Sequence, residues 1–389
     1  MSKKLGYRTQ AIHAGEDRDS CDIAPPLHMA NTYLFKNANE AAQAFETEDQ
    51  PIYTRWGNPT IAVMESKIAA LESAEAAIAT ASGMAAVSAA LFSTLKAGDH
   101  IIASSGIYSG TYHLIHEDLP QLGIAVSQAD AECPGSFADA IRPNTKVIYL
   151  ESPGNPTLML NDITAIVEIA QAHGITTIMD NTFATPFNQK PIILGIDIVI
   201  HSATKFLGGH GDAMGGAVAG LKTDIDRVRK GPIRRMGGCI SPFNAWLISR
   251  GICTFPLRMQ QHNENALGIA KYLAGHPAVA WVRYPWHTTH PQYDLARAQM
   301  EGGGGGVVVF ELKGGVVAGV KCLDRVELCA RTVSLGDVRS LITHPASTTH
   351  HSLSPEARRQ TGISDGLVRF AVGLENVEDI IDDLEQALT

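Results

Sequence analysis

The sequence predicts an α/β fold in which a doubly wound, mostly parallel sheet precedes a smaller α+β domain. Between residues 61 and 220, segments with strand character alternate with segments of helical periodicity, which is typical of parallel α/β sheets. The strand segments at 148–150 and 177–179 lack the alternation of polar and apolar residues that marks a half-exposed strand, as expected for strands covered on both faces. The 389 residues exceed one ordinary domain, so a second domain is expected.

The predicted elements occur in a regular order along the chain. Residues 1–60 mix polar, Pro and Asn positions without clean periodicity and are expected to form an arm that reaches a neighbouring subunit. Helices are predicted at 61–73, 82–95, 109–122 and 163–173, and strands at 76–81, 100–105, 123–128, 146–153, 176–182 and 197–202. In the second helix Met84, Val87, Leu91 and Leu95 share one face.

The second half of the chain predicts a different arrangement. Two helices are expected at 243–251 and 257–276, followed by strands near 306–315 and 365–373 and a helix at 377–388. The boundary is predicted near residues 254–258. The expected organisation is therefore an arm at 1–60, an α/β domain at 61–255 and a smaller α+β domain at 256–389.

Composition and charge favour a protein of the cytoplasm that binds a small molecule. With 40 acidic and 31 basic side chains, a net charge of −9 predicts binding of neither nucleic acid nor anionic membrane. The first ten residues lack the apolar core of a secretory signal, and no apolar stretch is long enough to span a bilayer. Six scattered cysteines without C-x-x-C spacing predict neither a disulfide framework nor a metal site.

The first candidate site residues open the helix at 82–95. Ser82, Gly83 and Met84 directly follow a strand, where free backbone N–H groups and the positive end of the helix dipole can bind a phosphate without a lysine. Serine is also a common N-cap, so these residues taken alone favour a simple helix start.

Two further candidates follow strands that are expected to be neighbours. Asp180 comes at the end of the strand at 176–182, and Lys205 follows the strand at 197–202 within Ser202-Ala203-Thr204-Lys205. A lysine at a strand end can form a Schiff base with an aldehyde, and a carboxylate can keep a pyridine nitrogen protonated. Together with a phosphate site, these are the requirements of pyridoxal 5'-phosphate (PLP).

The same four residues also match the S-x-x-K motif of penicillin-binding proteins, in which the serine is acylated. The companion S-D-N motif is absent, and the nearest K-T-G candidate is Lys222-Thr223-Asp224. The serine also follows an apolar strand of a parallel α/β pattern. The PLP interpretation therefore explains more of the chain.

Nearly the whole chain resembles the Cys/Met metabolism family of PLP-dependent enzymes, which includes cystathionine γ-synthases, cystathionine γ-lyases, methionine γ-lyases and O-acylhomoserine sulfhydrylases. The motifs that carry the resemblance are Tyr53-Thr54-Arg55, Gly57-Asn58-Pro59-Thr60, Ser82-Gly83-Met84, Tyr108 with Ser109-Gly110-Thr111, Glu151-Ser152-Pro153 with Asn155-Pro156, Asp180-Asn181-Thr182, Ser202-Ala203-Thr204-Lys205, Ser334-Leu335-Gly336, His344-Pro345-Ala346 and Arg369.

The resemblance implies a PLP-dependent aminotransferase-like fold (fold type I) and a role for each matched residue. Lys205 is expected to hold the cofactor covalently, Asp180 to pair with its ring nitrogen and Tyr108 to stack on the ring. The phosphate is expected to bind Ser82, Gly83, Met84, Ser202 and Thr204, together with Tyr53 and Arg55 of a neighbouring subunit. Arg369 is expected to bind the substrate α-carboxylate, with Ser334 and Asn155 beside it. The family also implies a homotetramer assembled from dimers.

The expected reaction is γ-elimination on methionine or homocysteine, with Lys205 and Tyr108 moving protons. Val333 followed by Ser334 is similar to methionine γ-lyases, and an apolar Val333 disfavours the charged far end of cystathionine. In contrast, Gly110 and Ile233-Arg234 stand where those lyases usually carry Cys and a Lys-Asp pair, and the segment 344–350 is more like sulfhydrylases. Two alternatives remain: γ-replacement on an O-acylhomoserine, as in a sulfhydrylase or cystathionine γ-synthase, and a catalytically silent PLP-binding protein.

Overall fold

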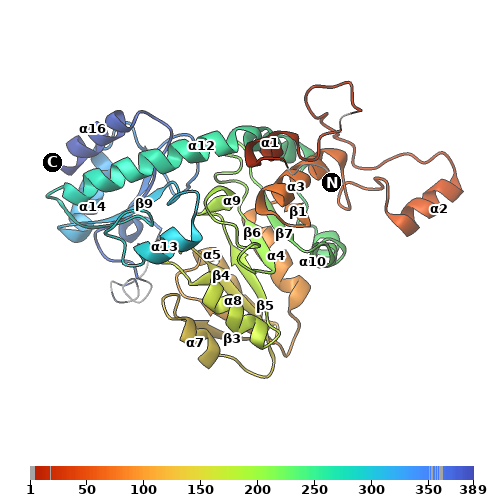
Figure 1. Ribbon diagram of the computed structural model, residues 1–389, viewed down its shortest axis with the longest axis horizontal. Coiled ribbons are helices and arrows are strands. Elements are labelled where there is room, and N and C mark those ends of the chain that lie inside the picture. The colour runs from red at the N-terminus through yellow and green to blue at the C-terminus, as the bar shows by residue number, and fades with distance from the viewer. Residues whose placement is uncertain are drawn as a thin grey trace.

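The computed structural model places two sheets side by side, each with its own helices (Figure 1). It describes residues 5–17, 19–349, 351, 354, 356, 358 and 362–389. The last residue of the segment 344–350, His350, lies outside the described residues.

The larger sheet has seven strands in the order β1-β7-β6-β5-β4-β2-β3. Its strands are β1 (Ala76–Thr80), β2 (His100–Ser104), β3 (Ala125–Ala129), β4 (Thr145–Glu151), β5 (Thr176–Asp180), β6 (Ile198–His201) and β7 (Gly216–Gly220). Strands β6, β5, β4, β2 and β3 pair in parallel, whereas β7 pairs antiparallel with both β1 and β6. The predicted fold class is confirmed.

Strand β7 was not predicted. Its sequence, GAVAG, contains one β-branched residue and no aromatic residue, which is little strand character. Glycine usually weakens a strand. The structure gives the reason for the small residues: a Cβ atom on Gly216 would lie 2.2 Å from the Ser82 carbonyl oxygen, and one on Gly220 would lie 2.6 Å from that of Asp197. Only glycine permits this close approach of backbones.

Helices cover both faces of the larger sheet. The helices of the described chain are α1 (Tyr7–His13), α2 (Ala38–Thr47), α3 (Pro59–Glu72), α4 (Gly83–Thr94), α5 (Ser109–His113), η1 (Leu114–Asp118), α6 (Leu119–Gln121), α7 (Pro134–Asp139), α8 (Ile163–Ala172), α9 (Thr185–Asn188), α10 (Lys222–Val228), η2 (Arg229–Ile233), α11 (Arg234–Met236), α12 (Pro242–Gly275), α13 (Tyr293–Gln299), α14 (Gly315–Arg325), η3 (Pro345–Ser347) and α16 (Val377–Leu388). One apolar core joins the sheet to α4 and α10, and two others join its opposite face to α3, α12, α7 and α8.

The smaller sheet has five strands in the order β10-β11-β12-β9-β8. Its strands are β8 (Val279–Arg283), β9 (Val307–Leu312), β10 (Ala330–Arg331), β11 (Leu341–Thr343) and β12 (Leu367–Ala371). All pairs are antiparallel except β10 with β11. Helices α14, α16 and the second half of α12 share one apolar core with it. This sheet lies within the region predicted to form an α+β unit.

One continuous helix, α12, replaces the two helices predicted at 243–251 and 257–276. It runs for 34 residues through Pro256 and joins the two halves of the molecule (Figure 1). A proline inside a helix removes a hydrogen bond and costs about 3 kcal/mol or more. Burial offsets that cost, because the first half of α12 packs Ile248, Ile252 and Phe255 in one core and the second half packs Ile269 in another. The proposed domain boundary therefore falls within a helix.

The N-terminal segment contains two helices that were not predicted. Helix α1 packs on α3 and α12, and Lys67 donates hydrogen bonds to the Ala11 and Ile12 carbonyls at its C-terminal end. Beyond α1 the chain projects from the body and carries α2 at its tip (Figure 1). Ile23 and Leu34 are fully exposed on this projection. Exposed large apolar side chains on an extended segment are typical of a contact with another chain.

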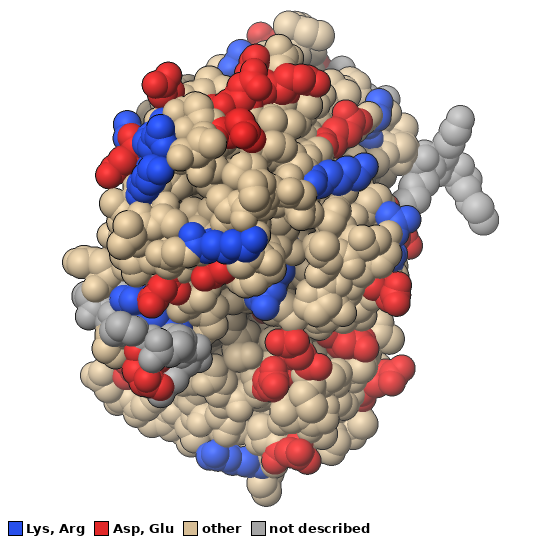
Figure 2. Space-filling view, turned by 90° about the vertical axis from the view of Figure 1, so that its left-hand side faces the viewer, with Lys and Arg blue, Asp and Glu red and all other residues tan. Residues whose placement is uncertain are grey.

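Among the described residues, no helix is both long and apolar enough to cross a membrane. On the end of the molecule that carries α14 and α16, acidic and basic side chains are interspersed (Figure 2).

Candidate active site

The carboxyl ends of three neighbouring parallel strands carry the central residues. Glu151 and Asp180 are the last residues of β4 and β5 and are register partners, and Lys205 follows β6 in a tight turn. Ligands of open α/β sheets bind at this edge. The strands that precede Asp180 and Lys205 are neighbours, as expected. The Asp180 carboxylate accepts a hydrogen bond from the Thr182 amide at 2.9 Å, although burial raises its pKa.

The Lys205 amine lies between the two halves of the molecule. Its Nζ donates a hydrogen bond to Ser334 Oγ at 2.9 Å. Burial lowers the pKa of Lys205, and the nearby positive charge of Arg369 lowers it further. Both effects disfavour the ammonium form of this lysine.

The start of α4 lies against the turn that carries Lys205. Ser82 is the N-cap of α4, and its Oγ accepts a hydrogen bond from the Ala85 amide at 3.1 Å. A Cβ atom on Gly83 would lie 2.8 Å from Ser202 Cβ, so glycine is needed for this contact. The first-turn amides of Gly83 and Met84 have no partner within the helix, which leaves them able to bind an anion.

A backbone amide holds the Thr204 hydroxyl in place. Thr204 Oγ1 accepts a hydrogen bond from the Gly215 amide at 3.0 Å, and the Ser202 amide donates to Thr182 Oγ1 at 2.8 Å. A cavity of about 570 Å³ opens beside Thr204 and Ser334. Its volume is within the range of small-molecule sites.

Tyr108 precedes α5 and is 45% exposed. Its amide donates a hydrogen bond to Glu151 Oε2 at 2.7 Å. Its ring covers Gly110, because a Cβ atom added there would lie 2.6 Å from Tyr108 Cε1 and 3.2 Å from Met84 Sδ. The ring, Gly110 and the start of α4 therefore form one side of the site.

Arg369 lies on β12 in the middle of the smaller sheet and is only 9% exposed, so it is not a surface arginine of an edge strand. Its guanidinium donates to Asn155 Oδ1 at 3.1 Å and to the backbone oxygens of Val333, at 2.5 Å, and Ser334, at 3.4 Å. Burial lowers its pKa to about 10, so it still carries a charge at neutral pH. The Val333 side chain is 59% exposed.

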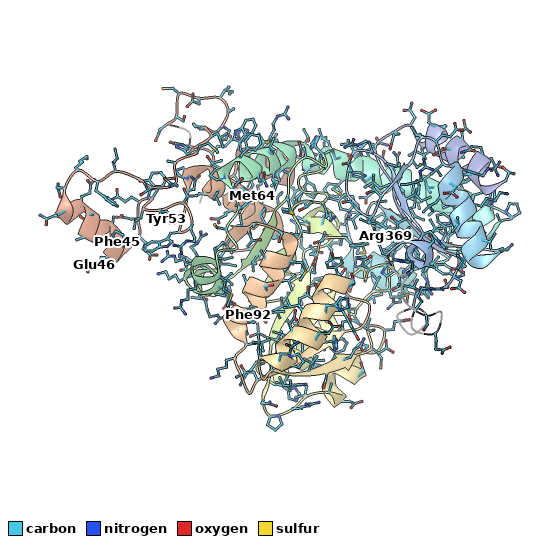
Figure 3. All side chains as sticks on the ribbon, turned by 180° about the vertical axis from the view of Figure 1, so that it is seen from behind. Phe45, Glu46, Tyr53, Met64, Phe92 and Arg369 are labelled. Carbon is cyan, nitrogen blue, oxygen red and sulfur yellow. The ribbon has the colours of Figure 1, made fainter. Side chains whose placement is uncertain are left out.

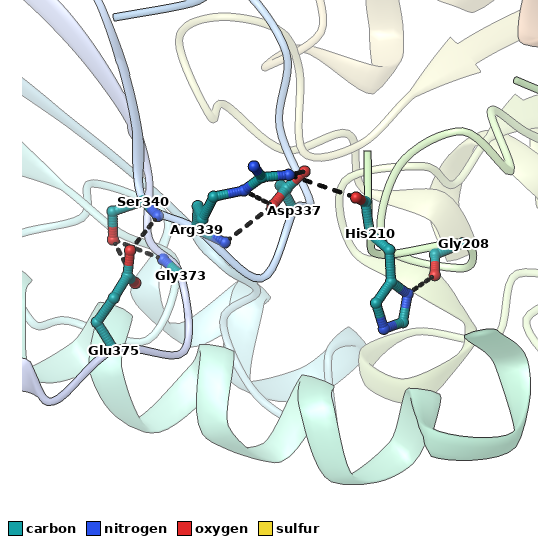
Figure 4. Close-up of polar contacts among 7 residues, drawn as sticks. All are labelled: Gly208, His210, Asp337, Arg339, Ser340, Gly373 and Glu375. Carbon is teal, nitrogen blue, oxygen red and sulfur yellow. Dashed lines mark hydrogen bonds and ion pairs between the residues drawn. The ribbon is translucent and has the colours of Figure 1, made fainter. Parts of the chain in front are cut away.

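The loop that presents Ser334 is held at several points (Figure 4). The Val338 amide donates to the Gly209 carbonyl at 3.0 Å, next to the turn that carries Lys205. Asp337 accepts a hydrogen bond from Arg339 Nε at 2.9 Å, and Ser340 Oγ donates to Glu375 Oε2 at 2.9 Å. The Val338–Gly209 bond joins this loop to the segment that follows Lys205.

Comparison with known proteins identifies the family. The model of the family described as Cys/Met metabolism PLP-dependent enzyme matches residues 8–389. The chain belongs to this family. It is 46% identical to an L-methionine gamma-lyase of Fusobacterium nucleatum over 390 residues, which cover 99% of this chain and 98% of that protein. It is 39% identical to an O-acetyl-L-homoserine sulfhydrylase of Leptospira meyeri, and the match covers 100% of this chain and 98% of that protein.

A solved structure of a family member supports the same assignment. A Campylobacter jejuni protein, proposed to be an O-acetylhomoserine (thiol)-lyase, superposes with a TM-score of 0.95 at 33% identity, covering 99% of this chain and 100% of that one. That structure contains a pyridoxyl-lysine phosphate at its position 205. The family is PLP-dependent, and the residues of this chain fit the cofactor. They provide an amine, a carboxylate, an aromatic ring and a helix start at which Gly83 allows close contact with Ser202.

Two residues expected in the Cys/Met family site are not brought to it within one chain. Tyr53 lies on the projecting arm, on the opposite side of the body from Arg369 (Figure 3). The Arg55 guanidinium lies over the Tyr53 ring, 5.2 Å from its centre, and donates a hydrogen bond to the Arg234 carbonyl. Arg234 in turn pairs with Glu48 at 2.6 Å. The Arg234 side chain thus holds the arm through its ion pair with Glu48.

Sequence reasoning missed the position of Glu151 in this Cys/Met family site. The residue was noted only as part of a motif, yet it is 3% exposed, contacts the Tyr108 amide and is the register partner of Asp180. The signal was available, because Glu151 ends a predicted strand in the same way as Asp180.

Proposed function

We propose that this protein catalyses γ-elimination on methionine or homocysteine, as a PLP-dependent carbon–sulfur lyase. With methionine, water is consumed and 2-oxobutanoate, ammonia and methanethiol are formed. The observation that carries the proposal is that the Arg369 guanidinium donates to the backbone oxygens of Val333 and Ser334, so a residue with an uncharged side chain stands next to the proposed carboxylate site. A substrate held at Arg369 by its carboxylate then needs no charged partner for its thioether, and the Val333 side chain offers none for the distant charges of cystathionine. The similarity to methionine γ-lyases supports this choice.

We assign the cofactor contacts to residues at the strand ends. Lys205 holds PLP covalently, Asp180 faces the ring nitrogen and Tyr108 stacks on the ring. The phosphate binds the Gly83 and Met84 amides at the start of α4 and the hydroxyls of Ser82, Ser202 and Thr204. When bound, PLP withdraws electrons from the substrate Cα and so weakens the bonds to that carbon.

The chain's own residues orient the substrate and move its protons. Arg369 binds the α-carboxylate with both nitrogens of its guanidinium, while Asn155 and Ser334 hold Arg369 and Lys205 in place. Once the substrate amine has displaced it, the Lys205 amine, whose pKa burial lowers, would take the proton from Cα, give that proton up and then take one from Cβ. The Tyr108 phenol donates a proton to the departing sulfur.

We further propose that each site is built from two chains. Tyr53 and Arg55 reach the phosphate of a neighbouring subunit, and the assembly is a homotetramer of two such dimers. The exposed apolar side chains of the arm and the distance of Tyr53 from its own site support this arrangement. A protein of this composition is expected to work in the cytoplasm.

A second candidate is γ-replacement on an O-acylhomoserine with sulfide or a thiol. Gly110 favours it, since methionine γ-lyases usually carry a cysteine at this position, and so does similarity to sulfhydrylases. The third candidate, a PLP-binding protein without catalysis, leaves the buried Arg369 and the Lys205–Ser334 contact without a purpose.

The deciding experiment incubates the purified holoenzyme with methionine, homocysteine, cystathionine, and O-acetylhomoserine plus sulfide. 2-Oxobutanoate and thiol products are quantified for each. Release of methanethiol and oxo acid from methionine alone establishes elimination. Homocysteine formed only from the acyl ester and sulfide replaces the proposal by the sulfhydrylase. Turnover that persists in Lys205→Ala would exclude the proposed role of that lysine.

A further inference from the structure

Two buried carboxyl groups lie side by side at the proposed cofactor site. Glu151 and Asp180 are register partners at the ends of adjacent parallel strands, so their side chains leave the same face of the sheet. Adjacent strands are about 4.8 Å apart. Glu151 is 3% exposed, and its Oε2 accepts the hydrogen bond of the Tyr108 amide at 2.7 Å.

Among the described residues, the positive charge of Arg369 lowers the pKa of Glu151, but no basic side chain forms an ion pair with it. No ion pair within 4.0 Å between residues that the structure describes includes Glu151. The titratable groups that face the pair are Tyr149 on β4, Tyr108 before α5, Arg369 on β12 and His201 on β6. Without substrate, the Arg369 guanidinium donates to Asn155 and to two backbone oxygens, and it makes no hydrogen bond to Glu151.

The two carboxyl groups differ in what stabilises a negative charge. Asp180 accepts hydrogen bonds from Thr182 and is attracted by His201. Glu151 accepts a single amide, and burial together with the charge of Asp180 raises its pKa well above the usual value. Two adjacent buried carboxylates resist being ionised together, so one proton stays with the pair.

We propose that Glu151 is a positioning residue that remains a neutral carboxylic acid in the working enzyme. Its oxygen fixes the Tyr108 backbone where α5 begins, which sets the ring above Gly110. Its neutrality leaves Asp180 as the single anion opposite the cofactor nitrogen. This inference rests on the proposed function for the roles of Asp180 and Tyr108, but the proton on Glu151 is measured without substrate.

The test uses the resting holoenzyme and three variants: Glu151→Gln, Glu151→Ala and, as an exposed control, Glu132→Gln. Infrared spectra at neutral pH should show the carbonyl stretch of a buried protonated carboxylic acid, identified by its shift in D₂O. The band should persist in Glu132→Gln and be absent from Glu151→Gln. Circular dichroism and cofactor content establish that each variant folds.

Kinetics separate a neutral acid from a carboxylate. Glutamine keeps the acceptor oxygen without a charge, so Glu151→Gln should lower kcat by no more than about threefold, whereas Glu151→Ala leaves the Tyr108 amide unpaired and should lower it about tenfold to hundredfold. A wild-type spectrum without the band, a band that survives in Glu151→Gln, or a glutamine variant as impaired as alanine overturns the proposal. A band at Glu151 in a protein that forms no thiol from methionine refutes the proposed function and leaves the proton assignment intact.

Discussion

Gly110 decides where the Tyr108 ring can lie. A Cβ atom at this position would come within 2.6 Å of the ring, so Gly110→Ala must displace it from the face it shares with Met84. If Tyr108 stacks on the cofactor and donates the proton to sulfur, kcat for elimination should fall about tenfold, equivalent to about 1.4 kcal/mol. The matched control is Gly275→Ala, since nothing lies within 4 Å of a Cβ atom there. Equal kcat values for the two variants would show that the ring position is unimportant.

Some site residues could be predicted from the local sequence, and others could not. Lys205 and Asp180 could be predicted, because residues at the ends of parallel strands converge whatever the loops do. The partnership of Glu151 with Tyr108 could not, since it depends on the path of the loop that follows β2. The arm residue Arg55 was predicted from family resemblance alone, and no local pattern indicates which chain's site it reaches.

At the scale of elements, helices and strands with a regular pattern of apolar residues were predicted correctly. The failures include the continuous helix α12 and the glycine-containing strand β7. The strands β4, β5 and β6 and the helices α4 and α8 lie where they were expected. Two helices were predicted where α12 is continuous, since packing on both halves of α12 outweighs the helix-breaking preference of Pro256. Strand β7 was not predicted, because its glycines are required by close contacts with the backbone of distant segments. The local sequence gives no sign of those contacts.

Helix α12 also supports the turn that carries Lys205, through the buried Arg258. Its guanidinium donates to the carbonyls of Phe206 at 2.7 Å, Gly251 at 2.9 Å and Leu207 at 3.2 Å. A lysine cannot satisfy three divergent carbonyls. Arg258→Lys should therefore lower the free energy of unfolding by about 2 kcal/mol and weaken PLP binding to the apoenzyme. Thermal melting and PLP titration test this, with the exposed Arg250→Lys on the same helix as the control. A variant with wild-type PLP affinity would limit Arg258 to a role in stability.

At the scale of the whole molecule, buried histidines make stability depend on pH. His100, His262 and His290 are at most 2% exposed, and burial lowers the pKa of each from 6.5 to about 4. Between pH 6.5 and 4 the unfolded chain therefore binds more protons than the folded chain. The free energy of unfolding is highest above pH 6.5 and decreases as the pH falls towards 4. Each histidine contributes about 3 kcal/mol over this range. Melting temperatures should fall steadily from pH 7 to 4.5, and less steeply in His100→Gln than in the exposed control His173→Gln. Parallel profiles for both variants would contradict the assignment for His100.

The arm makes the arrangement of chains testable by mixing two inactive variants. In Lys205→Ala the amine is missing, and in Arg55→Ala a proposed phosphate ligand is missing. If each site takes Lys205 from one chain and Arg55 from its partner, a mixed dimer has one site with both residues and one with neither. Refolding the two variants together in equal amounts should then restore about a quarter of wild-type activity, because half of the dimers are mixed and half of their sites are intact. If a single chain supplies both residues, mixing restores nothing beyond the average of the separate variants. The Arg55–Arg234 contact holds the arm to its own chain, so this outcome also decides whether that contact positions a residue for the neighbouring site.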